Sequence, residues 1–283
     1  HLYCAWENGF TPLTVGCPVL IGDGLKGTDD IPVPVPGGEY VKEARIGRTI
    51  MDADVFISLT HFKGHEMTGF GGTIKNIGMG CGSRAGKKDQ HCNGKAVIDP
   101  AACRGCKRCL RECANDGLVY DAERRVMTVD ADHCVVAGVV GACNFDAIGF
   151  AHDAAIKELN CRMAEYTKAV VYGRPNFHIS LVCDVSPVRC HAGNDVPIIP
   201  DVGMFASFDP VALDQACADA VLAQTPAPNS ALFDEGCDCS SGDYFHAAIG
   251  TDWAVCLEHA EKIGIGTRAY ELIKSDRNET KQT

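Results

Sequence analysis

The spacing of hydrophobic and polar residues predicts strands and amphipathic helices along most of the chain. Residues 52–60 (DADVFISLT) form a short apolar run between acidic residues, which indicates a strand in a buried sheet. Residues 152–171 follow a helical pattern, and residues 177–185 (FHISLVCDV) form a second apolar run typical of a strand. These patterns predict an α/β fold.

Two further helices are predicted in the last third of the chain from their end signals and their apolar faces. Asp209 and Pro210 are residue types preferred at a helix N-cap and at the first helical position, and Gly264 is a typical helix stop. The apolar faces of these two helices would consist of Leu213, Ala216, Cys217, Ala220 and Val221, and of Trp253, Cys256, Leu257, Ala260 and Ile263.

The first hundred residues are predicted to form strands and turns that lead into a glycine-rich loop. Eight glycines fall within residues 61–91, which indicates positive φ angles or close approach of the backbone to another group. A compact cysteine-rich unit follows at residues 96–150. We therefore expect a single α/β host domain, made of residues 1–95 and 151–283, with a small α+β ferredoxin-like segment inserted at 96–150.

The composition and charge argue against two classes of protein, those that bind nucleic acid and those that span a membrane. The chain has 283 residues, of which 46% are hydrophobic, enough for a packed core. Its formal net charge of −11 argues against binding to nucleic acid, because neutralising phosphates requires an excess of Lys and Arg. No apolar run approaches the roughly 18 residues of a membrane span, and no signal peptide is recognised. We expect a cytoplasmic protein without a membrane segment, although the start at His1 leaves open what precedes it.

Seventeen cysteines in one chain require an explanation. A disulfide framework is typical of small secreted domains with little core and an even number of cysteines. This chain has enough hydrophobic residues for a large core, and its number of cysteines is odd. Cys183, Cys217 and Cys256 lie in apolar stretches, where free cysteine behaves as a small buried hydrophobic residue. We therefore expect a reducing cytoplasm, no structural disulfides, and core positions for these three residues.

Residues 103–115 (CRGCKRCLRECAN) contain four cysteines at spacings of three, three and four. This is the ligand run of a bacterial iron–sulfur ferredoxin, except that Ala114 replaces the usual proline. A second, incomplete run follows, because CANDGLVY from Cys113 aligns with CNFDAIGF from Cys143. Between these stretches the second half-repeat carries VVAGVVGA instead of cysteines, and only Cys134 resembles a remnant ligand.

In two-cluster ferredoxins the fourth cysteine of each run binds the other cluster. This rule indicates which of the two cluster sites still has four cysteine ligands in this chain. One complete ligand set remains, and it consists of Cys103, Cys106, Cys109 and Cys143. The other site would have Cys113 and at most Cys134, so we expect one [4Fe–4S] cluster and no second cluster. Two alternatives stay open. Cys113 could be the fourth ligand of a local cage, or the four cysteines could bind a zinc ion, although their spacing favours an iron–sulfur cluster.

Several long stretches resemble an uncharacterised iron–sulfur centre protein family, domain of unknown function 362. They are HFKGHEMTGFGGTIKNIGMGCGSRAGK (61–87), the ferredoxin-type segment, VPIIPDVGMFASFDPVALDQA (196–216) and HAEKIGIGTRAYELI (259–273). The resemblance covers nearly the whole chain and implies an α/β host with an inserted ferredoxin-type segment, found mainly in anaerobic bacteria and archaea. Typical members carry two complete runs, whereas this chain has lost the second. The resemblance implies no substrate, so function must be argued from the site.

In the host domain, His61, Lys63 and His65 are the candidate catalytic residues. They follow the predicted strand 52–60, and α/β proteins tend to build their sites at strand ends. A His-x3-His pair on a helix would suit a zinc ion, but Gly64 makes a helix doubtful here. The same stretch supplies Lys75, Arg84 and Lys87, which with Lys63 could surround an anion nest of backbone N–H groups.

These host-domain residues have a structural alternative, in which they only brace the inserted segment. The pairs Cys190–His191 and Cys237–Cys239 could ligate a metal, but such pairs are more often loop residues without a partner.

The leading functional hypothesis is a redox protein that passes single electrons to a host-domain reaction, to a redox partner protein or to a small-molecule substrate. Basic residues beside the cysteine run, Lys107, Arg108 and Arg111, could favour a reduced cluster or attract an acidic electron donor. One alternative is a non-redox metalloenzyme that uses His61 and His65, with a structural cluster. Another is a non-catalytic binding or assembly module.

Overall fold

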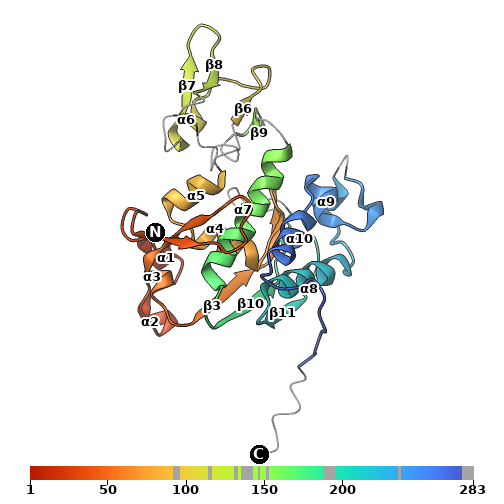
Figure 1. The fold of residues 1–283 in the computed structure, drawn as a ribbon. Coiled ribbons are helices and arrows are strands. Elements are labelled where there is room, and N and C mark those ends of the chain that lie inside the picture. The colour runs from red at the N-terminus through yellow and green to blue at the C-terminus, as the bar shows by residue number, and fades with distance from the viewer. Residues whose placement is uncertain are drawn as a thin grey trace, which may run out of the picture.

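The computed structural model describes residues 1–91, 96–113, 117–130, 133–134, 143–145, 147–150, 153–187, 196–234 and 237–275 (Figure 1). The helices are α1 Leu2–Glu7, α2 Pro12–Val15, α3 Arg48–Met51, α4 Thr73–Cys81, α5 Arg84–His91, α6 Arg108–Glu112, α7 Asp153–Val171, α8 Pro210–Leu222, α9 Tyr244–Ile249 and α10 Ala254–Lys262. The strands are β1 Asp30–Pro34, β2 Glu43–Gly47, β3 Phe56–His61, β4 Lys63–His65, β5 Gly69–Gly71, β6 Ala96–Ile98, β7 Leu118–Asp121, β8 Val126–Val129, β9 Ile148–Phe150, β10 Asn176–Val182 and β11 Gly203–Ser207.

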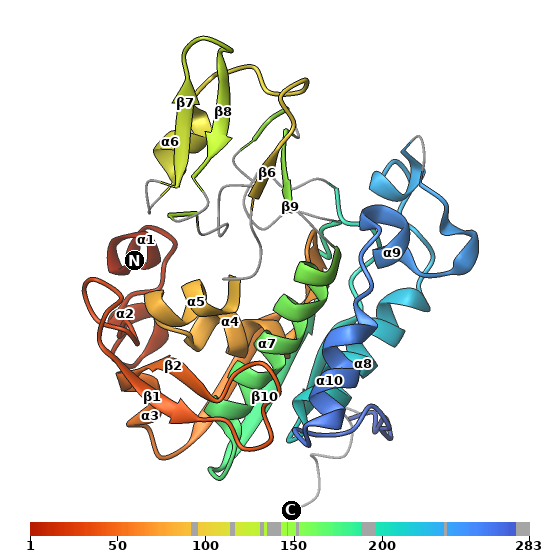
Figure 2. The same cartoon turned by 45° about the horizontal axis from the view of Figure 1, so that its top comes forward.

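Mixed helices and strands confirm the predicted α/β class. The host sheet has the order β11–β10–β3, in which β10 pairs parallel to β3 and antiparallel to β11. Helices α4 and α8 contact strands of this sheet, and α7 and α10 pack on α4, α8 and each other. Figure 2 shows these helices gathered beside β10. The main apolar core lies among them, and β1–β2 and β4–β5 form separate hairpins.

Helix α8 begins as predicted but is more deeply buried than predicted. The Asp209 carboxylate accepts the backbone N–H groups of Val211 and Ala212 at 2.8 and 3.0 Å, and Pro210 follows at the first position. The sequence indicated one apolar face, but every residue from Pro210 to Ala218 is buried. The helix lies between the sheet and α10, so two of its faces are covered.

Strand β3 is present where the sequence predicted a strand, but its apolar residues face away from the helices. Ile57 and Leu59 are exposed, whereas Ser58 and Thr60 are buried. The buried hydroxyl groups are satisfied, because Ser58 Oγ bonds His178 Nδ1 at 2.9 Å and Thr60 Oγ1 accepts a hydrogen bond from Asn76 at 2.9 Å. Burial lowers the pKa of His178 to about 4, so this imidazole is neutral.

The glycine-rich stretch is not the predicted loop. It forms the β4–β5 hairpin and the helices α4 and α5. Its glycines allow close packing: a Cβ on Gly78 would lie 2.2 Å from the Met163 carbonyl oxygen of α7. At the start of α4, the Asp214 carboxylate of α8 accepts the backbone N–H groups of Thr73 and Ile74 at 2.6 and 2.9 Å.

The cysteine-rich unit stands apart from the host layers in both views (Figures 1 and 2). Its first and last strands, β6 and β9, pair antiparallel, and Ala96 is opposite Phe150. The β7–β8 hairpin and α6 complete the described part, around an apolar cluster of Ala96, Cys109, Leu118, Met127 and Ile148. The chain therefore enters and leaves this unit at one place.

None of the helices within the described ranges combines the length and the apolar character that a membrane span requires.

Candidate functional site

Cys103, Cys106, Cys109 and Cys143 line one pocket of the cysteine-rich unit, here called the cysteine pocket. Its volume is about 320 Å³, including space open to solvent. The remaining lining residues are Arg104, Lys107, Arg108, Met127, Phe145, Ala147 and Ile148. The structure therefore brings together the first three thiols of the first run and a thiol thirty-four residues beyond Cys109.

A tight loop positions the first three of these cysteines. Gly105 and Lys107 both have φ near 61°, in the left-handed region, so the backbone turns twice between Cys103 and Cys109. Gly105 is required there because a Cβ would lie 2.2 Å from the Arg125 carbonyl oxygen. Cys109 is then buried in α6.

The surroundings of the thiols are apolar on one side and basic on the other. Met127, Ala147 and Ile148 are buried, and the Met127 backbone N–H donates to Cys103 Sγ at 3.4 Å. Burial raises the pKa of Cys109, and the neighbouring Cys106, Cys143 and Cys103 raise it further, although a hydrogen bond from the Leu110 backbone opposes them. The other three thiols that line the cysteine pocket therefore all act on Cys109.

Cys113 and Cys134 are not among the residues that line the cysteine pocket. Both are half-buried and pack against the apolar cluster of the unit. The whole VVAGVVGA stretch lies outside the described residues.

His61, Lys63 and His65 lie in strands, so the doubt about a helix is confirmed. His61 ends β3, is exposed, and its Nε2–H donates to the Cys183 carbonyl oxygen at 2.7 Å. Lys63 and His65 belong to β4, where His65 is buried and its Nδ1 accepts the Met67 N–H at 3.2 Å. The three side chains thus come from two different sheets, and a common catalytic site for them stays a prediction.

The backbone around these residues explains Gly64. Its N–H donates to the Ser186 carbonyl oxygen at 2.8 Å, and a Cβ would lie 1.8 Å from the Pro187 carbonyl oxygen. Glycine is needed because β4 runs directly against this segment.

Other residues singled out in the sequence are a lysine of the predicted anion nest, the two candidate metal-binding pairs and the three predicted core cysteines. The Lys87 ammonium donates to the Gly82 carbonyl oxygen at the end of α4, which is a helix-capping contact. Cys237 and Cys239 are free thiols with Sγ atoms 3.6 Å apart, and Cys190–His191 lies outside the described residues. Cys217 and Cys256 are buried as predicted, but Cys183 is only half-buried.

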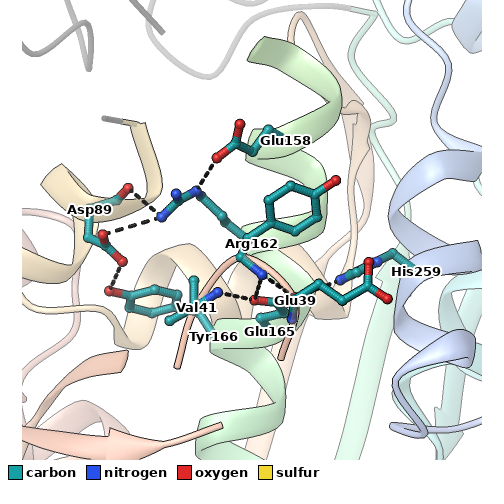
Figure 3. Close-up of polar contacts among 9 residues, drawn as sticks. Glu39, Val41, Asp89, Glu158, Arg162, Glu165, Tyr166 and His259 are labelled. Atoms are coloured by element: carbon teal, nitrogen blue, oxygen red, sulfur yellow. Dashed lines mark hydrogen bonds and ion pairs between the residues drawn. The ribbon is translucent and has the colours of Figure 1, made fainter. Parts of the chain in front are cut away.

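Sequence reasoning missed a polar network along α7 (Figure 3). The wholly buried Glu165 carboxylate accepts backbone N–H groups from Glu39, Tyr40 and Val41 at 2.7, 3.1 and 2.5 Å, and it bonds His259 Nε2 at 2.9 Å. Burial alone would raise the pKa of Glu165, but the hydrogen bonds from His259 and from these backbone groups lower it.

A second set of contacts continues this network toward α5 (Figure 3). The Arg162 guanidinium contacts Glu158 at 2.8 Å and Asp89 at 3.3 Å, and the Tyr166 hydroxyl donates to Asp89 at 2.9 Å. Together the two sets connect α7 to α5, to α10 and to residues 39–41. No local sequence signal could have identified Glu165, because its partners are 94 to 126 residues away.

Within the part of the chain that the structure describes, no three His, Cys, Asp or Glu side chains are grouped so that they could hold a metal ion.

A family model described as Domain of unknown function (DUF362) matches residues 1–219. Searches of curated proteins and of solved structures gave no match.

Proposed function

The chain belongs to the family described as Domain of unknown function (DUF362), and we propose that it is an iron–sulfur redox protein with one [4Fe–4S] cluster. The ligands would be Cys103, Cys106, Cys109 and Cys143. The observation that carries this proposal is that these four thiols, from two distant stretches, line one pocket, whereas Cys113 does not.

The donor set fits such a cluster. Four thiolates are its usual ligands, and because each binds a different iron, the sulfurs need only face one common volume. The buried side chains of Met127 and Ile148 limit access of water, and the Met127 N–H stabilises negative charge on Cys103 Sγ. When bound, a [4Fe–4S] cluster takes up and releases single electrons.

The architecture of residues 96–150 supports a ferredoxin-like insertion. Two antiparallel pairs, β6–β9 and β7–β8, and the short helix α6 make a small α+β unit with its own apolar cluster. The first and last strands of the unit, β6 and β9, lie side by side, and β9 contacts α7 of the host domain. The proposed role is electron transfer to a reaction in the host domain or to a partner, in a reducing cytoplasm.

Anaerobic purification with iron and sulfide counts and a redox titration would test this proposal. We expect about four iron and four sulfide ions per chain and a reversible one-electron transition followed by electron paramagnetic resonance. Zinc in place of iron, or a cluster that cannot be reduced reversibly, would count against it. Metal analysis beyond iron tests the metalloenzyme alternative at His61 and His65.

A further inference from the structure

Three basic side chains, Arg104, Lys107 and Arg108, line the cysteine pocket and are exposed, and no acidic residue shares this lining. Here they are called the basic rim. Their charge contrasts with that of the whole protein, whose formal net charge is −11. A fourth basic residue, Arg111, follows one turn later on α6, and no acidic residue lies between 103 and 111.

Two members of the basic rim are held by contacts within the unit. The Lys107 ammonium lies 3.8 Å from the centre of the Tyr120 ring, and its backbone is in the left-handed conformation. Arg108 Nη1 donates to Asn144 Oδ1 at 3.3 Å. These contacts restrict the side chains, so less conformational entropy is lost when a partner binds.

An apolar side chain lies among these charges. Phe145 lines the same pocket and is 46% exposed. An exposed aromatic residue surrounded by polar and charged residues is the usual anatomy of a protein interface. The unit stands apart from the host domain in both views (Figures 1 and 2). Phe145 and the three basic side chains are all exposed on it.

We propose that the basic rim, together with Phe145, is the docking surface for an acidic one-electron carrier protein. The inference rests on the proposed function, because a cluster in the cysteine pocket would fill the concave space and leave only the exposed rim for contact. Such a surface suits a broad protein face better than a small anion, which needs walls on several sides. Opposite charges would steer the encounter and make it sensitive to salt.

The test uses the full chain with its cluster and a flavodoxin, an acidic flavin protein, as probe. The affinity of flavodoxin for the chain is measured by calorimetry at about 0.1 M salt, where charges further than about 10 Å from the contact are screened. The rim variant combines Arg104→Glu, Lys107→Glu and Arg108→Glu. The control combines Lys26→Glu, Lys88→Glu and Lys274→Glu, three exposed host-domain lysines whose replacement changes the net charge equally.

We expect the rim variant to bind at least about 10-fold more weakly and the control to bind within about twofold of the unmodified chain. A charge-conserving variant, Arg104→Lys with Lys107→Arg and Arg108→Lys, should bind normally. Equal affinity of the rim variant and the unmodified chain would overturn the proposal. So would an equal loss in the control, or binding of pyrophosphate without binding of flavodoxin.

Iron content separates the failure of this inference from the failure of the proposed function. A chain without about four irons contradicts the proposed function, whatever the docking result. A loaded chain whose rim variant binds flavodoxin normally contradicts only the docking surface. If the triple variant loses iron, Arg104→Glu alone is measured, and about a threefold weaker affinity is expected. Reduction by the methyl viologen radical cation should not be slowed in the rim variant, whereas reduction by flavodoxin should be.

Discussion

Cys143 and Cys113 compete for the role of fourth cluster ligand, and single substitutions distinguish them. Both thiols pack against the apolar cluster of the unit, but Cys143 lines the cysteine pocket and Cys113 does not. Cys143→Ser should therefore lose most of the iron or leave a three-iron form. Cys113→Ala should keep the iron content and cost at most about 1 kcal/mol of unfolding free energy, because this small side chain is only half-buried. Iron and sulfide counts and denaturant unfolding measure the two effects.

The opposite result would have a clear meaning. If Cys113→Ala empties the site and Cys143→Ser does not, the cage is local to the first run and the crossover argument is wrong.

At the scale of the element, the contact between α4 and α7 depends on one glycine and not on its neighbour. A Cβ on Gly78 would lie 2.2 Å from the Met163 carbonyl oxygen, whereas one on Gly80 meets only Asn76 Oδ1 at 3.8 Å. We expect Gly78→Ala to lower the unfolding free energy by about 2 kcal/mol or more, because the helices must separate. Gly80→Ala should be neutral or stabilise by up to about 1 kcal/mol, because alanine is the better helix former. Equal effects of the two substitutions in denaturant unfolding would contradict this packing.

The contact between α7 and α10 should make stability depend on pH. Burial alone would lower the pKa of His259, but Cys161 and Glu165 outweigh burial and raise it to about 9. Since the unfolded value is near 6.5, the stabilisation is complete below pH 6.5 and is lost as the pH rises to about 9. We expect the unfolding free energy to fall by about 2–3 kcal/mol over this interval.

The variant His259→Gln keeps a hydrogen-bond donor for Glu165 but does not titrate. Its unfolding free energy should be lower than that of the unmodified chain at pH 6.5 and should change less between pH 6.5 and 9. Parallel pH profiles for the two proteins would show that the imidazolium does not contribute.

Elements could be predicted from the sequence where their own residues determine them. The strand at 52–60 and the start of α8 at Asp209 follow from local pattern and capping. The orientation of β3 could not be predicted, because Ser58 is buried only through its bond to His178, which is 120 residues away. Helix α4 was missed because glycines lower helix propensity, and here the cap from Asp214 of α8 offsets that cost.

For the candidate site too, some residues could be predicted from the local sequence and others could not. Spacing and the half-repeat were enough to propose all four cysteines of the pocket. No local sequence pattern predicts the position of Phe145 in the pocket lining, because it depends on how the chain folds back on itself. The same holds for the contact of Lys107 with the Tyr120 ring and for the hydrogen bond from Arg108 to Asn144. For His61 and His65 the local pattern suggested a shared site. His61 is exposed at the end of β3 and His65 is buried in β4, and a site common to both stays a prediction.

At the scale of the whole molecule, the proposed function requires thiols that stay reduced. The chain has 17 cysteines, and each of the fifteen in the described part of the chain is free, including Cys237 and Cys239 with sulfurs 3.6 Å apart. Burial raises the pKa of Cys217 and Cys256, so these thiols should not react in the folded protein, whereas the exposed Cys4 and Cys17 should react first. After anaerobic removal of the cluster, a thiol count under denaturing, non-reducing conditions should approach 17. Fewer than about fifteen thiols, a margin for slight oxidation, would reveal disulfides and contradict the expected reducing environment.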